Sequence, residues 1–316
     1  MRALIRHVLT AAVAVLGAAT AHAQAPAPGA REPIIDMHLH AYRLEQGETR
    51  WPFHRMCVND ARPCGNGPST YSSRRDYLLE GTLDMMRKRG VVLGYLSGDL
   101  TELAHWHDVG GTRFFPSAQL WDGVTLGPSE LRAALAAGRV LGVGEIGAQY
   151  DGIPPNDARL EPYFALAESL DVPVLIHTAG LGSREPAFRS GNGHPLLLEE
   201  VLARHPHLRL YVENAGYPFL DEMIALLVQH PALYVDVSTI TWLVPREAFH
   251  DYLRALVRAG FGKRIMFGSD QLYWPEVIGE AIDAVQSAPF LTHAQQRDIL
   301  YHNAARFLRL GTVPSS

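Results

Sequence analysis

The chain has 316 residues, a formal net charge of −5 and 47% hydrophobic residues. This composition is typical of a globular protein with a sizeable core and excludes a disordered or fibrous chain. Because the charged residues form no basic block, the sequence gives no indication of nucleic-acid binding.

The N-terminus has the pattern of a secretory signal peptide. Arg2 and Arg6 precede the apolar run "VLTAAVAVLGAATA", and the small residues "AHA" end at Ala23. The run is too short and too rich in alanine for a good membrane anchor, although an uncleaved anchor is the alternative. We therefore expect a signal peptide over residues 1–23, a flexible segment over residues 24–32, and a secreted or periplasmic mature protein that has no membrane contact after cleavage.

Short runs rich in Val, Ile and Leu follow at intervals along residues 33–310. We predict strands over residues 33–40, 91–98, 112–121, 140–147, 172–179, 208–216, 233–238 and 264–270. They are apolar on both faces, as expected for parallel strands that are covered by helices. Amphipathic patterns predict helices over residues 73–90, 156–171, 193–206, 219–231, 246–260, 276–285 and 292–310. Gly90 marks the end of the first helix, and Asn156 or Asp157 is expected to cap the second.

Eight strands that alternate with helices in a chain of this length predict an α/β fold, a single-domain (β/α)8 TIM barrel over residues 33–310. The alternative is an open, doubly wound sheet. No Gly-rich phosphate loop of the dinucleotide-binding type follows the first strand, which disfavours that alternative.

A long irregular stretch, residues 42–73, follows the first predicted strand and is rich in Pro and Gly. Loops of this length are usually functional lids or disordered segments. It contains both cysteines of the chain, Cys57 and Cys64. In an exported protein a disulfide is the favoured interpretation, with a metal-binding pair as the alternative. The disulfide in turn favours an ordered lid.

Polar side chains gather at the predicted strand ends, where a barrel of this type carries its active site. His38 and His40 are two positions apart on one strand, so both face the same side and can bind one cation. Asp36 shares that side and is expected to orient a histidine ring. His177 and Asp270 are expected to contribute ligands from across the mouth of the barrel. Three histidines and a carboxylate suit Zn²⁺ best, with Mn²⁺ as an alternative.

Each of these residues also has an ordinary interpretation. A His-x-His pair arises by chance or in core packing, His177 alone fits a buried histidine with satisfied hydrogen bonds, and Asp270 fits a helix cap. Tyr150 and Tyr273 follow strand ends and are weaker candidates for the pocket lining, with ordinary packing as the alternative. The indication of a metal site comes from the coincidence of these types at several strand ends in order.

The motifs "DMHLH", "GEIG", "VLIHTAG", "FGSD" and "NAARFL" together resemble the amidohydrolase superfamily of metal-dependent hydrolases. The sequence is most similar to the amidohydrolase-related branch, which also includes nonoxidative decarboxylases, and the resemblance spans residues 33–310. It implies that His38 and His40 bind the metal and that His177 joins them or binds a second metal. It also implies that Asp270 binds metal and shuttles the proton of the attacking water.

Two further positions follow from the resemblance. The "GEIG" stretch is also similar to strand four of the deoxyribonuclease-like members, which implies that Glu145 is a metal ligand in a centre of one or two ions. The alternative is a hydrogen bond from a ligating histidine to Glu145. At strand six many members carry a histidine, whereas this chain has "VENAGYP". Either Glu213 or Asn214 takes that position, and strand alternation predicts that only one of them faces the interior. Glu213 can bind metal or accept a proton, whereas Asn214 can only hydrogen-bond.

These residues predict hydrolysis of an ester, lactone or amide-type bond of a small molecule by a metal-activated water, with Asp270 as proton shuttle. One alternative is the nonoxidative decarboxylation of a small aromatic or enol carboxylic acid, which the missing strand-six histidine weakens. The other is a non-catalytic periplasmic binding protein, against which the complete ligand set argues. The only partner expected is the small-molecule substrate, and a homo-oligomer is left open.

Overall fold

The computed structural model describes residues 31–42, 76–120, 126–181 and 186–311. The predicted signal peptide, the predicted disulfide and nearly all of the predicted lid lie outside the described residues. Within the described ranges, no helix is both long enough and apolar enough to cross a membrane.

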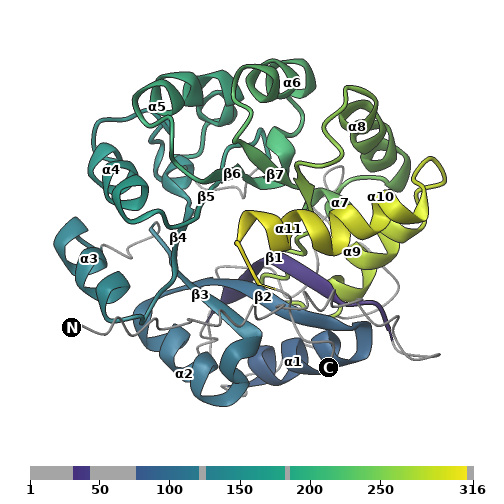
Figure 1. The fold of residues 1–316 in the computed structure, drawn as a ribbon, viewed down its shortest axis with the longest axis horizontal. Helices are drawn as coiled ribbons and strands as arrows, with labels where there is room; N and C mark the ends of the chain where they lie inside the picture. Colours follow the sequence, from purple (N-terminus) through teal and green to yellow (C-terminus); the bar gives the residue numbers. More distant parts are fainter. Residues whose placement is uncertain (1–30, 43–75, 121–125, 182–185, 312–316) are drawn as a thin grey trace, which may run out of the picture. The chain divides into compact units, whose positions relative to one another are not determined.

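Eight parallel strands form one sheet whose order follows the chain (Figure 1): β1 (Ile34–Ala41), β2 (Val91–Gly98), β3 (Phe114–Ala118), β4 (Gly142–Ile146), β5 (Val174–Ile176), β6 (Leu210–Val212), β7 (Tyr234–Asp236) and β8 (Ile265–Met266). The first and last strands approach each other as well. The Met37 N–H donates to the Phe267 carbonyl at 2.9 Å, and the Asp270 N–H donates to the His38 carbonyl at 2.8 Å. The sheet is therefore a nearly closed barrel, and the predicted (β/α)8 fold is confirmed.

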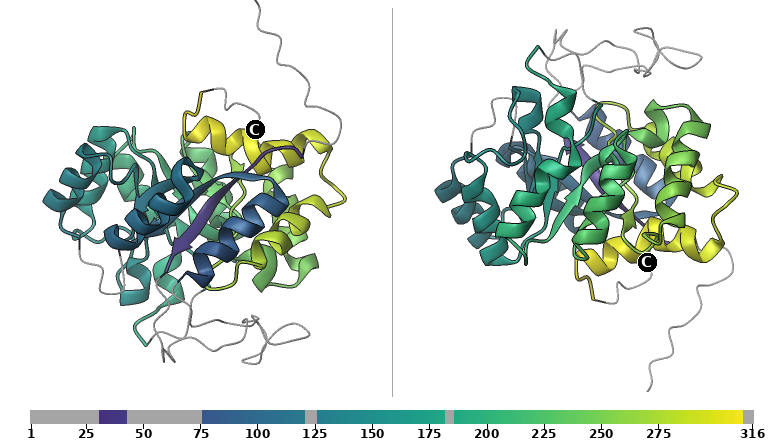
Figure 2. Two further views of the ribbon diagram at one scale, coloured as in Figure 1. Left: turned by 90° about the horizontal axis from the view of Figure 1, so that it is seen from below. Right: turned by 90° about the horizontal axis from the view of Figure 1, so that it is seen from above.

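Helices surround the strands (Figures 1 and 2): α1 (Tyr77–Arg89), α2 (Leu100–Gly110), α3 (Pro128–Ala136), α4 (Glu161–Leu170), α5 (Glu199–Arg204), α6 (Leu220–Gln229), α7 (Ile240–Leu243), α8 (Arg246–Arg258), α9 (Val277–Gln286), α10 (His293–Arg297) and α11 (Asn303–Phe307). Three helices were not predicted from the sequence: α2 with 11 residues, α3 with 9 and α7 with 4. The predicted helix over residues 292–310 is divided by a π-helical turn at Asp298–His302.

The two predicted helix signals had different outcomes. Gly90 ends α1 in the left-handed conformation, with φ of 78°, as predicted. The prediction of an Asn156 or Asp157 cap is wrong, because α4 begins only at Glu161 and Leu160 stands at its N-cap without a side-chain hydrogen bond. Successive turns over residues 154–160 precede the helix, and the Asp157 carboxylate there binds Arg159 instead.

The apolar core has an outer layer between strands and helices and a smaller inner cluster inside the barrel. The inner cluster includes Met37, Tyr95 and Tyr211, and Phe307 of α11 packs on Tyr211 with ring centroids 5.3 Å apart. Apolar side chains thus fill one end of the barrel interior, which leaves the other end, at the carboxyl ends of the strands, for polar residues.

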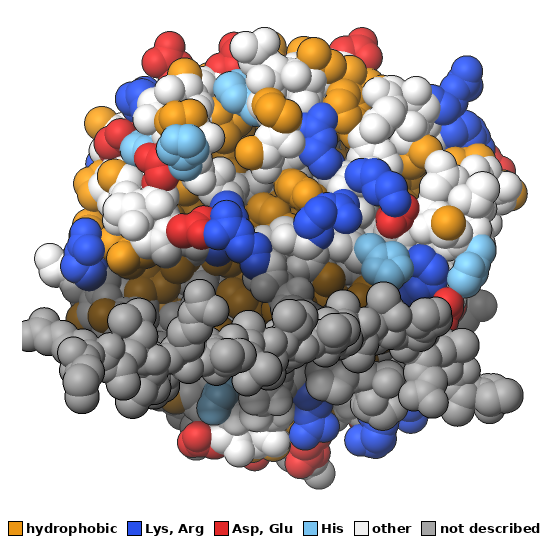
Figure 3. Space-filling model, in the orientation of Figure 1, with side chains coloured by type: hydrophobic (Ala, Val, Ile, Leu, Met, Phe, Trp, Pro, Cys, Tyr) orange, Lys and Arg blue, Asp and Glu red, His pale blue; other side chains and the backbone are white. Residues whose placement is uncertain are grey.

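On the face shown in Figure 3, Lys and Arg side chains are interspersed with Asp and Glu. Several of the surface ion pairs join neighbouring turns of one helix, such as Lys88 with Asp84 and Arg254 with Asp251. Pairs of this exposed kind contribute little to stability.

Candidate metal centre

An irregularity in β1 directs its two histidines into the barrel. Ile35 and Met37 belong to the inner cluster, whereas Leu39 belongs to the outer layer. The pairing of β1 with β2 shifts register between Asp36 and Leu39, so the alternation changes phase there. His38 and His40 follow Met37 into the interior, and both are almost completely buried.

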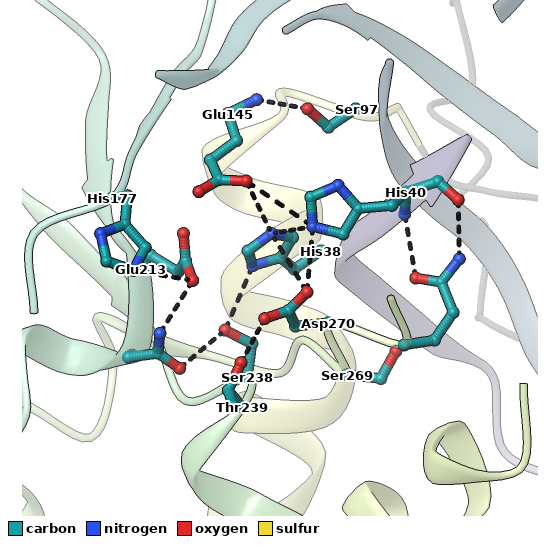
Figure 4. Close-up of polar contacts among 12 residues, drawn as sticks. His38, His40, Ser97, Glu145, His177, Glu213, Ser238, Thr239, Ser269 and Asp270 are labelled. Atoms are coloured by element: carbon teal, nitrogen blue, oxygen red, sulfur yellow. Dashed lines mark hydrogen bonds and ion pairs between the residues drawn. The ribbon is translucent and has the colours of Figure 1, made fainter. Parts of the chain in front are cut away.

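Four side chains bring nitrogen and oxygen atoms together at the carboxyl ends of the strands: His38, His40, Glu145 and Asp270 (Figure 4). The Nε2 atoms of His38 and His40 are 3.1 Å apart. Asp270 Oδ1 lies 2.9 Å from His40 Nε2 and 3.8 Å from His38 Nε2. Glu145 Oε2 lies 3.6 Å and 3.9 Å from the same two nitrogens. Ligands of one tetrahedral zinc ion, with bonds of about 2.0–2.2 Å, are separated by about 3.3–3.6 Å, which lies within this range.

Asp236, and not Asp36, stands beside the His38 ring. His38 Nδ1 is 3.2 Å from Ser238 Oγ and 3.6 Å from Asp236 Oδ2. Ser238 Oγ donates to Asp236 Oδ1 at 2.6 Å, so it can accept the Nδ1 hydrogen and leave the Nε2 lone pair for a ligand. The prediction for Asp36 is wrong because of the shift in β1: its carboxylate accepts the backbone N–H of His38 at 3.0 Å instead.

The charges around His38 favour a cation at this position. Burial lowers the pKa of His38, but the carboxylates of Asp270, Asp236 and Glu145 outweigh burial and raise it to about 9. Buried carboxylates of this kind require a positive partner. The same carboxylates would stabilise a divalent cation that His38 binds.

Asp270 follows β8 in a left-handed conformation, with φ of 47°. The Thr239 hydroxyl donates to its Oδ2, which leaves Oδ1 directed at the histidines. Burial alone would raise the pKa of Asp270, but His38, His40 and the Thr239 hydroxyl reverse this and lower it. The carboxylate is therefore ionised.

Glu145 reaches the centre because β4 runs very close to β5. Gly144 has φ of +119°, and a Cβ at this position would lie 2.3 Å from the Leu175 carbonyl oxygen. Only glycine fits there. The next residue, Glu145, is anchored by its backbone N–H, which donates to Ser97 Oγ. Burial raises the pKa of the Glu145 carboxyl although His40 and His38 lower it.

His177 lies just beyond β5 and has partners at both ring nitrogens. Nδ1 is 2.9 Å from Gln149 Oε1, and Nε2 is 3.0 Å from the Tyr150 hydroxyl. Burial lowers the pKa of His177 to about 3, so the ring is neutral, the form that binds metals. Its Nε2 lies 3.8 Å from Glu213 Oε1.

Both polar residues that follow β6 are buried at the centre. Glu213 continues the alternation that directs Tyr211 inward, and its carboxylate points toward His177 (Figure 4). Asn214 takes a left-handed conformation with φ of 54°, so strand alternation no longer applies to it. Asn214 Nδ2 donates to Glu213 Oε1 at 2.8 Å, and Asn214 Oδ1 lies 3.3 Å from Ser238 Oγ. Strand alternation predicted that only one of the two residues faces the interior, and this prediction is wrong because both lie at the centre.

The donor set fits a divalent cation. Among the described residues, three groups of donors each lie within 4.8 Å of one another: His38, His40 and Glu145; His38, Glu213 and Asp270; and Glu145, His177 and Glu213. Burial raises the pKa of the Glu213 carboxyl, and the neighbouring carboxylates of Glu145 and Asp270 raise it further, so a cation bound here would relieve their repulsion. All predicted site residues thus lie in one cluster.

Three residues at the end of β7 that support this cluster were not predicted from the sequence: Asp236, Ser238 and Thr239. The available signal was Asp236, a carboxylate near the end of the apolar run "LYVDVS". Gln149 and Gln271 were also missed. Gln271 pairs with the backbone of His40 through both amide atoms at 2.9 Å, and nothing in its sequence context distinguishes it from a surface glutamine.

The fold and the cluster together define a class: a (β/α)8 barrel with a candidate metal centre at the carboxyl ends of its strands. The sequence profile of the Amidohydrolase family matches residues 35–310. The chain belongs to this family and is an enzyme of the amidohydrolase superfamily. The family suggests a divalent metal, for which the donor groups above are candidate ligands.

The individual relatives have low sequence identity to this chain. Protein fluG of Emericella nidulans is 26% identical over 159 residues, which is 46% of this chain, and the chain spans only 18% of that protein's length. An uncharacterized TIM-barrel protein from Bordetella bronchiseptica is 19% identical, with a TM-score of 0.62 over 88% of this chain and 99% of that one. An amidohydrolase from Burkholderia multivorans with bound zinc is 18% identical, with a TM-score of 0.59 over 89% and 100% of the two chains. These two structures share the barrel fold.

Proposed function

We propose that the chain is a metal-dependent hydrolase that cleaves an ester, lactone or amide-type bond of a small molecule, with Asp270 as the residue that accepts the proton of the attacking water. The observation that carries the proposal is the convergence of His38, His40, Glu145 and Asp270, with separations of 2.9–3.9 Å between the histidine nitrogens and their neighbours. Family membership argues against the non-catalytic binding protein considered from the sequence.

These four residues would hold the ion, and their nitrogen and oxygen donors suit Zn²⁺ best and Mn²⁺ next. A bound divalent ion of this kind lowers the pKa of water toward about 7 and polarises a carbonyl group. The remaining contributions come from the protein itself.

Asp270 is placed to accept and release a proton. Thr239 binds Oδ2, so only Oδ1 is directed into the centre. The lowered pKa of Asp270 keeps it ionised before turnover, as a proton acceptor must be. Because Asp270 is only 5% exposed, a proton that it accepts would stay in the centre until the leaving group takes it.

The surroundings keep these groups fixed and dry. His40 stacks on Tyr42 with ring centroids 4.5 Å apart, and Tyr42 stacks on Tyr273 at 4.9 Å. His38 and His40 are at most 1% exposed. Electrostatic interactions in such a buried site are stronger than in water and need little reorganisation during the reaction.

The test is a product screen on purified, metal-loaded protein with panels of esters, lactones, amides and aromatic carboxylic acids. The proposal predicts a water-dependent product from one of the first three panels, and loss of both metal and turnover in His38→Ala. Release of carbon dioxide from a carboxylic acid without any hydrolytic product would instead establish the decarboxylase alternative.

We also propose that the enzyme acts outside the cytoplasm. This proposal rests on the sequence pattern of residues 1–23 alone. N-terminal sequencing of the protein expressed in a Gram-negative host tests this. A mature protein in the periplasm that starts at Gln24 supports the proposal, and an intact N-terminus on cytoplasmic protein contradicts it.

A further inference from the structure

We propose that a cavity at the amino-terminal end of the barrel binds a small polyanion that carries phosphate or carboxylate groups. The cavity has a volume of about 340 Å³, which falls within the range of small-molecule sites. Ile34, the first residue of β1, borders the cavity. His38 and His40 lie further along the same strand, toward its other end. The cavity is therefore separate from the candidate metal centre and independent of the proposed function.

Cationic side chains from three separate segments line this cavity: Arg31 before β1, Lys88 and Arg89 at the end of α1, and Arg297 at the end of α10. Basic residues in the last turn of a helix commonly interact with the helix dipole, which explains Lys88 and Arg89 without a ligand. This explanation does not extend to Arg31, which precedes a strand. It does not extend to Arg297 either, because the helix continues from α10 through the π-helical turn into α11. The convergence of all four on one cavity is typical of an anion-binding site.

Arg297 is held in place before any ligand binds. Its side chain is only 10% exposed, its Nη2 donates to the Pro33 carbonyl, and its guanidinium carbon lies 5.8 Å from the centre of the Tyr301 ring. Its Nη1 makes no hydrogen bond with the parts of the chain that the structure describes. A guanidinium that is already fixed loses little side-chain entropy when it binds an anion, so Arg297 is the expected anchor of the ligand.

The carboxylates of α1 and α9 offset only part of the positive charge. Asp283 of α9 pairs with Arg89, and Asp84 of α1 is shared by Arg87 and Lys88, so two carboxylates face three cations on this side of the cavity. The side chain of Lys88 is 63% exposed. Exposed pairs of this kind are weak, so a ligand can compete with Asp84 for Lys88.

Glu32 is the one carboxylate among the residues that line the cavity. Its Oε2 lies 3.7 Å from Arg297 Nε and 2.9 Å from His293 Nε2, so Arg297 shares this partner. Burial lowers the pKa of Arg297 more than Glu32 raises it, which means that the buried charge is not fully compensated. Arg31 forms no ion pair with the described residues. Five arginine and lysine side chains thus face three carboxylates, and an anion with at least two negative charges would balance the excess.

The size of the cavity and its donors limit the class of ligand. A volume of about 340 Å³ holds about ten water molecules, which suits a pyrophosphate or a tricarboxylic acid rather than a nucleotide or a peptide. Arginine binds phosphate and carboxylate oxygens alike, so the chemistry that both ligands share is that of a compact polyanion. Inorganic pyrophosphate and citrate represent the two sources.

Isothermal titration calorimetry measures this binding without substrate or turnover. The full-length protein is titrated with inorganic pyrophosphate and, separately, with citrate, at low and at physiological ionic strength. We expect one site per chain for at least one of the two anions, and weaker binding at the higher ionic strength. Arg297→Gln should weaken this binding about 10- to 100-fold, as expected for the loss of a hydrogen bond between charged groups.

Two further variants separate the cavity from other anion-binding positions. Because Arg297 also binds the Pro33 carbonyl, its substitution can impair folding. The double variant Arg31→Gln/Lys88→Gln changes only exposed residues and should weaken binding about 3- to 10-fold. Arg132→Gln, at an exposed position of α3, removes the same kind of charge elsewhere and should keep the wild-type affinity.

Three results would overturn the proposed anion site. The first is that neither anion binds at millimolar concentration. The second is an unchanged affinity in Arg297→Gln and in the double variant, which is also the result expected if the anion binds at the metal centre. The third is equal weakening in Arg132→Gln, because this would be an effect of net charge alone. None of these results bears on the proposed hydrolase.

Discussion

Replacing Asp236 by Asn is expected to weaken metal binding without changing the shape of the centre. The asparagine oxygen can take the place of Oδ1, which accepts the backbone N–H groups of Asn214 and Ser238 at 3.0 Å. The amide nitrogen then replaces Oδ2, which lies 3.6 Å from His38 Nδ1. A donor in this place disfavours a hydrogen on Nδ1, and with it the tautomer that offers Nε2 to the metal.

The size of the effect follows from the role of such partners. Loss of the carboxylate behind a ligating histidine typically costs about 10- to 100-fold in metal affinity, which corresponds to about 1.4–2.8 kcal/mol. Competition between the protein and a fluorescent chelator for Zn²⁺ measures this change directly. Saturating metal should restore a large part of the lost turnover.

Asp36→Asn is the matched control. Both carboxylates are fully buried, but Asp36 accepts the backbone N–H groups of His38 and Ser269 at 3.0 and 2.9 Å rather than facing the ring. Burial raises the pKa of Asp36 to about 7, so it already lacks part of its charge near neutral pH. We expect Asp36→Asn to alter stability but hardly to alter Zn²⁺ affinity. Wild-type affinity in Asp236→Asn, or equal weakening in both variants, would refute the orienting role of Asp236.

Three other outcomes follow from the structure. Asp270→Asn should keep the far-ultraviolet circular dichroism of the wild type and lose about 100- to 10,000-fold in turnover; activity close to wild type would contradict its role as proton acceptor. Gly144→Ala, with φ of +119° and a Cβ at 2.3 Å from the Leu175 carbonyl oxygen, should lose about 2–5 kcal/mol of stability in denaturant unfolding, and an unchanged unfolding midpoint would show that β4 and β5 can separate. Burial raises the pKa of Glu168, but the hydrogen bond from His205 and its neighbours reverse this and lower the pKa below its ordinary 4.5. The interaction of Glu168 with His205 therefore stabilises the fold above pH 4.5, and this stabilisation is lost as the pH falls through the lowered pKa. His205→Gln should reduce the acid-dependent loss of stability in urea titrations, and an unchanged pH dependence would contradict the pairing.

The barrel could be predicted because its signals are local and repeated. Runs that are apolar on both faces indicated each strand. The number and spacing of these runs are compatible with few other folds. The fold then predicts which residues meet, since the carboxyl ends of the strands lie at one end of the barrel. Residues as far apart in sequence as His38 and Asp270 are thus brought to within 3.8 Å.

Details that depend on three-dimensional packing could not be predicted in this way. The shift of register in β1 moves Asp36 away from the His38 ring. No residue in "DMHLH" indicates that the register shifts there. The left-handed turn at Asn214 places both Glu213 and Asn214 at the centre, whereas simple alternation allows only one. Asp236 of β7 is linked to His38 of β1 through the Ser238 hydroxyl. This contact depends on the folded chain and has no signal in the sequence.

The dependence of turnover on metal tests the central proposal most directly. Protein stripped by a chelator and protein reloaded with Zn²⁺ or Mn²⁺ are compared on the ester, lactone or amide substrate that the screen identifies. The proposed mechanism predicts that turnover is abolished by stripping and restored by the ion, in parallel with the ion content of the protein. Near-normal turnover in protein that elemental analysis shows to be free of metal would contradict it.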